Sequence, residues 1–464
     1  MNAFNDPLKF VAAPVLLIVL FLATGCFGPK ELIDPYYSLH GLADAGKLRY
    51  DGFLIGIEKQ SRERIQAPLE GYPGISFPDT ISGISRVEQN WRRRDFRSLT
   101  DDPKALYVTH VMQYDRTDGA DPDRVKVSAV FNAYRDHHLP PFSASSRSYT
   151  LLDSAMTEKL KRGHENDNPF THILVFSMGW NTDQYQAVNR INRITDSLTA
   201  VSRNDPGTAF RPMVVALTWP SVWLKGSESE AIRSLGHISS YFNKANDADE
   251  IGYSIANKLI HQVILPKKQL EVRRTPLQVV LVGHSLGARL LSRAVFSRML
   301  LDDGGDHPGQ HVDLFVGLQP AFSANRFIDG KGGEGSPYAL FHQMNTAFAF
   351  TTSVHDRANQ KAIIAFGSLN LGSELGLNAA REHPEIFHIL KWSGPSDAEA
   401  IRRAGRSMKE QEKNRILLLD ASDIITDGSS RKPSGEYASA HNDIYDEEMA
   451  ELLWQLIKSF AAPD

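Results

Sequence analysis

The 464-residue sequence has almost no cysteine, since Cys26 is the only one. A single thiol cannot form a disulfide within the chain, so stability must come from a packed core. An excess of charge is missing too, because 51 Lys and Arg face 55 Asp and Glu for a formal net charge of −4. Nothing in this near-neutral balance predicts nucleic acid as a partner.

Patterns of metal, cofactor and repeat proteins are missing as well. His137 and His138 stand side by side, but no further ligand follows at metal-site spacing, so we expect ordinary loop histidines. The segment 330–335 is rich in glycine and contains Lys331, yet it does not lead from a strand into a helix as a phosphate-binding loop does. The sequence therefore predicts neither a metal nor a cofactor.

What the sequence does contain is a Gly-x-Ser-x-Gly pattern centred on Ser285. A β-branched apolar run at 279–282 precedes it, and apolar residues at helical spacing follow it, with arginines between them. Such a turn from strand to helix is the nucleophile elbow of serine hydrolases, which holds the serine in strained backbone geometry. Gly283 and Gly287 are expected where a side chain would collide with a neighbouring strand or helix. The alternative is a serine in a glycine-rich turn that only packs.

A serine hydroxyl needs a base and a group that orients the base, and in a parallel α/β sheet both follow the carboxyl ends of strands. For the acid we predict Asp356, which follows an apolar strand at 347–353. For the base we predict His441, which lies between the last predicted strand and a helix. In the structural alternative, Asp356 is a loop cap and His441 only precedes a helix capped by Asn442 or Asp443. Weaker candidates are Asp329, Asp420 and Asp423 for the acid, and His342, His355 and His388 for the base.

The oxyanion of acyl transfer needs N–H donors. One is expected at the backbone of Leu286, directly after the nucleophile. The second should come from the loop after an earlier strand. The apolar strand 173–176 leads into Ser177-Met178-Gly179-Trp180-Asn181. We therefore predict the N–H of Trp180 as the second donor, with that of Asn181 as the alternative.

From about residue 170 onward, short apolar strands alternate with helix-length segments. This alternation predicts an α/β fold, with a mostly parallel sheet covered by helices on both faces. The predicted strands are 173–176, 213–217, 279–282, 312–318, 347–353 and 416–419, and the predicted helices include 183–201 and 247–263. Upstream, 49–58, 106–114 and 125–134 are predicted strands. The last two form either the antiparallel edge of the main sheet or part of a small added layer.

Three motifs resemble the α/β-hydrolase superfamily, and more narrowly an esterase-like bacterial branch of it. They are Met178-Gly179-Trp180-Asn181, Trp219-Pro220-Ser221 and Gly283-His284-Ser285-Leu286-Gly287. The resemblance covers about residues 170–460 and implies a doubly wound sheet and a triad in the chain order Ser285, Asp356, His441. The chain departs from the branch at Met178, where the family usually has a histidine that braces the oxyanion loop.

The N-terminal segment 10–27 is almost entirely apolar and follows Lys9. It resembles a bacterial lipoprotein signal peptide, in which the chain is cut before a cysteine that is then acylated. This resemblance implies that Cys26 is the first mature residue and that the protein is lipid-anchored in the bacterial cell envelope, facing the periplasm. It leaves open whether the outer or the inner membrane holds the anchor. The alternative is an uncleaved anchor, since the run is just long enough to span a bilayer.

The predicted organisation is a signal peptide at 1–25, a tether at 26–48, an N-terminal region at 49–165 and a catalytic domain at 166–464. Together these features predict a membrane-tethered serine hydrolase that cleaves small carboxylic esters or thioesters through an acyl-enzyme. Two alternatives stay open, an inactive binding or scaffold lipoprotein on this fold and an acyltransferase. The segment 357–415 is either a lid or a surface excursion. Aromatic candidates for an acyl pocket are Trp180, Trp219, Trp223 and Phe322, although such residues are more often core.

Overall fold

The computed structural model describes residues 47–61, 104–116, 125–132, 141–205, 207–221, 244–245, 247–270, 276–298, 310–329, 338–361, 369–410, 415–426 and 440–462. The predictions for the signal peptide, for lipidation of Cys26 and for almost all of the tether lie outside these residues. So do those for His137, His138, the segment 330–335 and Trp223. Among the described residues, no helix combines the length and the apolar character that a bilayer-spanning segment needs.

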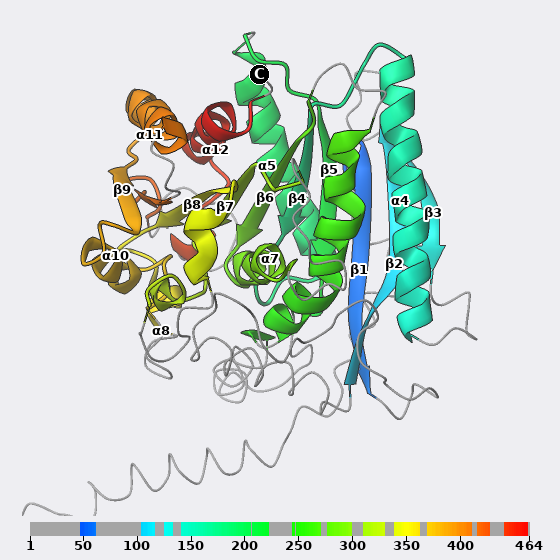
Figure 1. Cartoon of the computed structure of the whole chain (residues 1–464), viewed down its shortest axis with the longest axis horizontal. Helices are drawn as coiled ribbons and strands as arrows, with labels where there is room; N and C mark the ends of the chain where they lie inside the picture. Colours follow the sequence, from blue (N-terminus) through cyan, green and yellow to red (C-terminus); the bar gives the residue numbers. More distant parts are fainter. Residues whose placement is uncertain are drawn as a thin grey trace, which may run out of the picture.

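A ten-stranded sheet forms the centre of the protein (Figure 1). Its strands in spatial order are β3 (Val125–Asn132), β2 (Lys104–Arg116), β1 (Gly52–Ser61), β5 (Pro212–Thr218), β4 (His172–Ser177), β6 (Gln278–His284), β7 (Leu314–Leu318), β8 (Ala347–Thr352), β10 (Ile416–Asp420) and β9 (Phe387–Lys391). Within this sheet β1–β2 and β2–β3 are antiparallel and the other pairs are parallel. Of the two predicted placements for the upstream strands, the structure has the antiparallel edge of the main sheet.

The chain reverses its direction of travel through the sheet between β4 and β6. It runs from β4 outward to β5, and then returns across β4 to β6, β7 and β8. In open α/β sheets, ligands bind at such a switch point, beyond the carboxyl ends of the two strands. Here those ends are Ser177 and His284, so the loop containing Gly179 and the turn containing Ser285 lie at the switch point.

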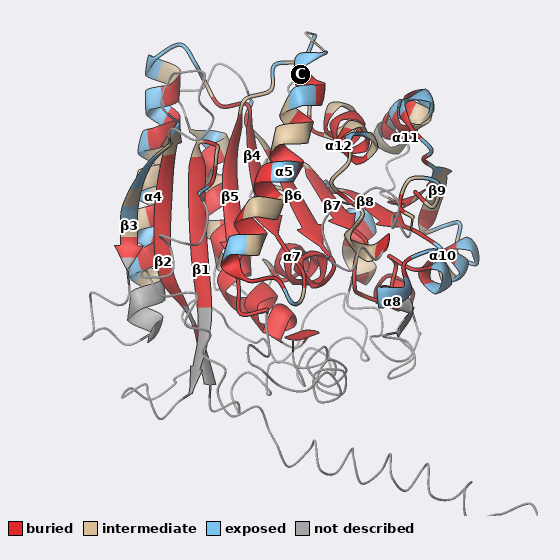
Figure 2. Ribbon diagram, turned by 180° about the vertical axis from the view of Figure 1, so that it is seen from behind, coloured by how far each residue is buried: buried red, intermediate tan, exposed pale blue. Residues whose placement is uncertain are grey.

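Successive strand residues enter two separate apolar layers, one on each face of the sheet. In β4, Ile173 and Val175 belong to one layer, whereas Leu174 and Phe176 belong to the other. The first layer is covered by α4 (Pro141–Glu165), α7 (Leu286–Phe296) and the helical stretch 247–264, and the second by α5 (Gln184–Arg203), α11 (Ala398–Glu410) and α12 (Glu447–Phe460). The central strands are therefore buried on both faces (Figure 2), which explains their continuous apolar sequences. The predicted α/β class, with helices on both faces of a mostly parallel sheet, is confirmed.

Two elements were not foreseen in the sequence. The segment 357–415 contains α8 (Arg357–Lys361) and α10 (Glu374–Arg381), but also β9, which pairs in parallel with β10 and extends the sheet. Because β9 is an edge strand, most of its residues are only half-buried and its sequence lacks a long apolar run. The other element is α4, whose buried apolar residues form a narrow stripe of Tyr149, Leu152, Met156 and Leu160 in an otherwise polar sequence.

Candidate active site

Ser285 lies in the turn between β6 and α7, with φ 55° and ψ −123°. A non-glycine residue in this region is strained, and the surrounding structure must hold it there. Its backbone N–H donates to the carbonyl of Leu318 at 3.0 Å, and its carbonyl accepts from the N–H of Ala321 at 3.2 Å. The end of β7 and the residues after it therefore hold the strained turn.

The two elbow glycines sit where the chain passes closest to its neighbours. A Cβ on Gly283 would lie 2.4 Å from the Cα of Ala288 in α7. A Cβ on Gly287 would lie 2.1 Å from the carbonyl oxygen of Ser177, at the end of β4. Both distances are far below van der Waals contact, so the turn requires glycine at both positions.

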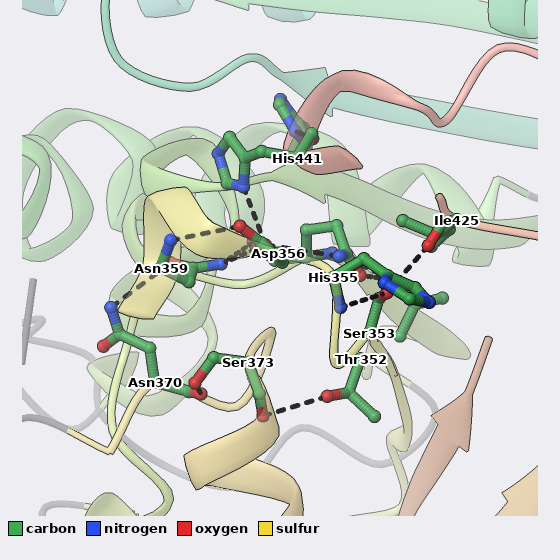
Figure 3. Close-up of polar contacts among 12 residues, drawn as sticks. Thr352, Ser353, His355, Asp356, Asn359, Asn370, Ser373, Ile425 and His441 are labelled. Carbon is green, nitrogen blue, oxygen red and sulfur yellow. Dashed lines mark hydrogen bonds and ion pairs between the residues drawn. The ribbon is translucent and has the colours of Figure 1, made fainter. Parts of the chain in front are cut away.

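Asp356 follows β8 and is fully buried. One carboxylate oxygen, Oδ1, accepts from the backbone N–H of Asn359 at 3.1 Å and so caps the start of α8. The other, Oδ2, accepts from Nδ2 of Asn359 at 2.8 Å, from Nε2 of Gln319 at 3.2 Å and from Nδ1 of His441 at 2.8 Å (Figure 3). Asp356 is therefore both the helix cap of the structural alternative and the partner of the predicted base.

The amides around Asp356 are themselves oriented by hydrogen bonds. Oε1 of Gln319 accepts from the hydroxyl of Thr351 at 3.0 Å, which turns Nε2 towards the carboxylate. Oδ1 of Asn359 accepts from Nδ2 of Asn370 at 3.2 Å, which does the same for its own Nδ2. The sequence reasoning missed Gln319, Asn359 and Asn370. A signal was present for the first two, since Gln319 follows a strand end directly and Asn359 stands three residues after the acid.

His441 lies in a short 3₁₀ turn, η10 (Ala440–Asn442). Because the carboxylate of Asp356 accepts, Nδ1 of His441 carries the proton and Nε2 is left to accept one. The helix that follows begins later than expected, since Asp446 caps α12 through the N–H of Met449 at 2.9 Å. Neither Asn442 nor Asp443 is the cap.

Ser285 and His441 are brought to the same end of the sheet but are not joined by a hydrogen bond among the described residues. Catalytic hydrogen bonds of this kind commonly shorten only when a substrate is bound. The weaker candidates lie elsewhere: Asp329, His342 and His355 are exposed, Asp423 pairs with Lys391, and His388 lies half-buried on β9. Asp420 accepts from Ser422 and pairs with Arg381.

The predicted oxyanion loop touches Ser285. A Cβ on Gly179 would lie 2.6 Å from Cβ and 3.1 Å from Oγ of Ser285, so only glycine lets the loop approach this closely. Leu286 is the first residue of α7, where the amide has no partner within the helix. The N–H of Asn181 donates to the carbonyl of Ser221 at 3.0 Å, which excludes Asn181 as the alternative donor in this conformation.

The Trp219-Pro220-Ser221 segment braces this loop. Nε1 of Trp219 donates to the carbonyl of Met178 at 2.9 Å. The hydroxyl of Ser221 donates to the carbonyl of Thr182 at 2.6 Å and accepts from its N–H at 3.1 Å. Met178 itself is buried in the apolar layer under α5 and α12. The loop is therefore fixed by hydrogen bonds from the segment that follows β5.

Of the aromatic residues expected to line an acyl pocket, Trp219 and Phe322 are buried core residues, and Trp180 is partly exposed. A cavity of about 1100 Å³ lies at the opposite end of the sheet, beside the residues that precede β1, β4 and β5. Its lining includes Tyr50, Phe170 and Arg211. This cavity is remote from Ser285 and cannot serve as its substrate pocket.

A second polar cluster is built around the arginines of α7, which stand between its apolar residues in the sequence. All residues of α7 are buried. Nη2 of Arg289 lies 2.6 Å and Nε of Arg293 lies 2.8 Å from the carboxylate of the buried Asp249. Nη2 of Arg326 lies 3.5 Å from the same carboxylate. Burial alone would raise the pKa of Asp249, but the three guanidinium groups lower it to about 2.

Among the described residues, no group of His, Cys, Asp and Glu is arranged to hold a metal ion. A scan against protein-family models finds none that matches the chain, and a search of curated proteins finds no significant match. The function must therefore be argued from the geometry around Ser285.

Proposed function

We propose that this protein is a serine hydrolase that cleaves carboxylic esters or thioesters through an acyl-enzyme. The observation that carries the proposal is the hydrogen bond between Asp356 and His441, formed beside a strained Ser285 at the switch point of the sheet. These residues come from segments far apart in the sequence. Packing alone gives no reason for the three side-chain types to meet at this point.

The fold inferred with this function is that of the α/β hydrolases. The strained serine follows a central parallel strand, the acid follows β8 and the base follows β10, which is the chain order of that superfamily. A close glycine loop follows β4, at the place where the superfamily has its second oxyanion donor.

In the proposed reaction, Nε2 of His441 takes the proton of Ser285 while Oγ attacks the acyl carbonyl. Asp356 holds the tautomer with the proton on Nδ1 and stabilises the imidazolium that forms. The N–H groups of Leu286 and Trp180 hold the oxyanion, since both lie on the segments that flank Ser285. Nε2–H then protonates the leaving alcohol or thiol, and water releases the acyl group by the same steps in reverse order.

The test is labelling of the full-length chain with a fluorophosphonate probe, compared with Ser285→Ala. The expected result is labelling of the wild type and none of the variant. Hydrolysis of p-nitrophenyl esters of increasing acyl length should depend on Ser285 in the same way. If the folded wild type shows neither reaction, the protein is a binding or scaffold protein on this fold. If an added alcohol takes up the acyl group in preference to water, it is an acyltransferase.

The membrane tether is part of the proposal and rests on the sequence alone. The apolar segment 10–27 and Cys26 fit a lipoprotein signal, which would anchor the hydrolase in the bacterial cell envelope facing the periplasm. Radiolabelled palmitate should label the wild type and not Cys26→Ser. Equal labelling of the two would contradict the lipoprotein assignment.

A further inference from the structure

His284, the residue before the nucleophile, contacts the predicted base directly. Its Nε2 lies 2.8 Å from the carbonyl oxygen of His441. The two imidazole rings pack against each other with their centroids 4.9 Å apart. Because a carbonyl oxygen only accepts, Nε2 of His284 carries a proton and donates it. A hydrogen bond therefore runs from the strand of the nucleophile to the backbone of the base.

We propose that His284 is a positioning residue that fixes the base relative to the nucleophile, an inference that rests on the function proposed above. His284 and Ser285 are consecutive residues at the end of β6, so they share one rigid strand end. Asp356 holds the side chain of His441 and His284 holds its backbone. With both ends held, the position of the imidazole relative to Ser285 is fixed.

Other contacts of the base loop lead to different parts of the fold. Within the described residues 440–446, the N–H of Asp443 donates to the carbonyl of Ala440 at 3.1 Å, and Oδ2 of Asp443 accepts from the N–H of Thr426 at 3.2 Å. Ala440 and Ile444 are buried in the apolar layer under α5 and α12, and Arg193 packs over the ring of Tyr445. The hydrogen bond from His284 joins the loop directly to the strand end that carries Ser285.

His284 is suited to this role because it stays neutral. The ring is buried, and burial together with the nearby His441 and Arg190 lowers its pKa well below the usual value. In the neutral form Nε2 is the donor and Nδ1 has no hydrogen. Nδ1 has no hydrogen-bond partner among the described residues, so a proton added there would be a buried donor without an acceptor. The bond to His441 therefore persists at neutral and mildly acidic pH.

A matched pair of substitutions separates the hydrogen bond from packing. In His284→Gln, the amide Nε2 is as many bonds from Cα as Nε2 of histidine and can donate to the same carbonyl. In His284→Met, a side chain of similar length fills the space but has no donor. We expect His284→Met to lower kcat for ester hydrolysis about a hundredfold, because a small displacement of a base has an effect of this size. KM should change little, since His284 is buried away from the substrate, and His284→Gln should restore most of the rate.

A second measurement does not depend on turnover. In the full-length chain labelled with ¹⁵N-histidine, the low-field proton resonance of His441 Nδ1 reports on its bond to Asp356. We expect this resonance to shift or broaden in His284→Met and to stay in place in His284→Gln. The proposal is wrong if His284→Met keeps both the wild-type kcat and the wild-type resonance, or if the two variants lose them equally. A wild type without Ser285-dependent turnover would overturn the proposed hydrolase instead, and the resonance comparison would still decide whether His284 positions His441.

Discussion

Two buried carboxylates, Asp356 and Asp249, have partners that differ in charge. Asp356 receives hydrogen bonds from the neutral amides of Gln319 and Asn359 and from His441. Asp249 is bound by the guanidinium groups of three arginines, two of them from α7 itself. Both carboxylates need partners, because a buried charge without them is costly. Only Asp249 has permanent cations.

The difference in the charge of the partners fits the different roles that the proposed function gives the two carboxylates. The negative charge of a carboxylate that already binds three cations is largely neutralised, so it stabilises a further cation only weakly. Asp356 is held in place by dipoles, so its charge remains available when His441 becomes an imidazolium. We infer that Asp249 serves stability and Asp356 serves chemistry, and the same substitution at the two sites should separate these roles.

Asp356→Asn should have the largest effect on activity. The side-chain NH₂ that replaces Oδ2 is a donor and would face the Nδ1–H of His441. The imidazole would then move its proton to Nε2, and Nε2 could no longer accept the proton of Ser285. If the proposed function is right, kcat should fall about 10⁴-fold, as it does in serine hydrolases changed in this way. Steady-state hydrolysis by protein of verified fold measures this effect. A fall of less than tenfold would mean that Asp356 has no part in the reaction.

Asp249→Asn should have the largest effect on stability. It leaves Arg289, Arg293 and Arg326 buried without their shared carboxylate, and breaking a buried pair costs about 3–5 kcal/mol. Denaturant unfolding should show this loss, while kcat per folded molecule stays near the wild-type value. If the variant does not fold, Arg289→Met gives a milder version, since Asp249 keeps two guanidinium partners. A large loss of kcat with no change in stability would reverse the assignment of the two carboxylates.

The contrast between these sites also shows what the sequence can and cannot predict. Ser285, Asp356 and His441 could be proposed because the elbow is a local pattern and the other two follow predicted strands. The positions of Gln319 after a strand end and of Asn359 three residues after the acid are only weak signals, and their role depends on three segments meeting around one carboxylate. The arginines of α7 show the same limit. Their places between the apolar residues do not reveal that they are buried, and it is the packing of the helical stretch 247–264 against α7 that covers them.

The strand alternation was enough to predict the α/β class, because buried parallel strands are continuous apolar runs. The edge strand β9 and the helix α4 were missed, since a half-buried strand and a helix with a narrow apolar stripe produce weak periodicity. Asn181 fails as the alternative oxyanion donor because its N–H is bound to the carbonyl of Ser221. A backbone hydrogen bond between two loops has no signature in the sequence.

Acid titration should show that His172 and Asp249 affect the stability of the fold in different pH ranges. Burial lowers the pKa of His172 to about 4, against about 6.5 in an unfolded chain. Its folded pKa is the lower one, so stability is lost as the pH falls from about 6.5 to about 4, by roughly 3 kcal/mol in all. Asp249, with a pKa of about 2, contributes stability that is lost only as the pH falls from about 4 towards 2.

His172→Gln tests these windows, because its amide can still donate to the carbonyl of Ala461, which accepts from Nε2 of His172 at 3.0 Å. The variant should have a flatter stability curve between pH 6.5 and 4, measured by urea unfolding at each pH. Its slope below pH 4 should match that of the wild type. Parallel curves across the whole range would show that His172 does not titrate in this window.

Gln319→Met should have the smallest effect, and it tests whether the amide donors of Asp356 matter to the chemistry. Methionine fills the space of glutamine but removes the donor 3.2 Å from Oδ2, leaving Asn359 and His441 to hold the carboxylate. A hydrogen bond to a charged group is worth about 1.5 kcal/mol or more, so we expect kcat to fall about tenfold with KM unchanged. Thr351→Val is the comparison variant, because it keeps Nε2 of Gln319 but removes the hydroxyl that donates to Oε1 of Gln319 at 3.0 Å and accepts from its backbone N–H at 2.9 Å. It frees the amide to rotate and should lower kcat by less. If both variants keep the wild-type kcat but lose stability, Gln319 holds the fold as Asp249 does, and the two carboxylates differ less than their partners suggest.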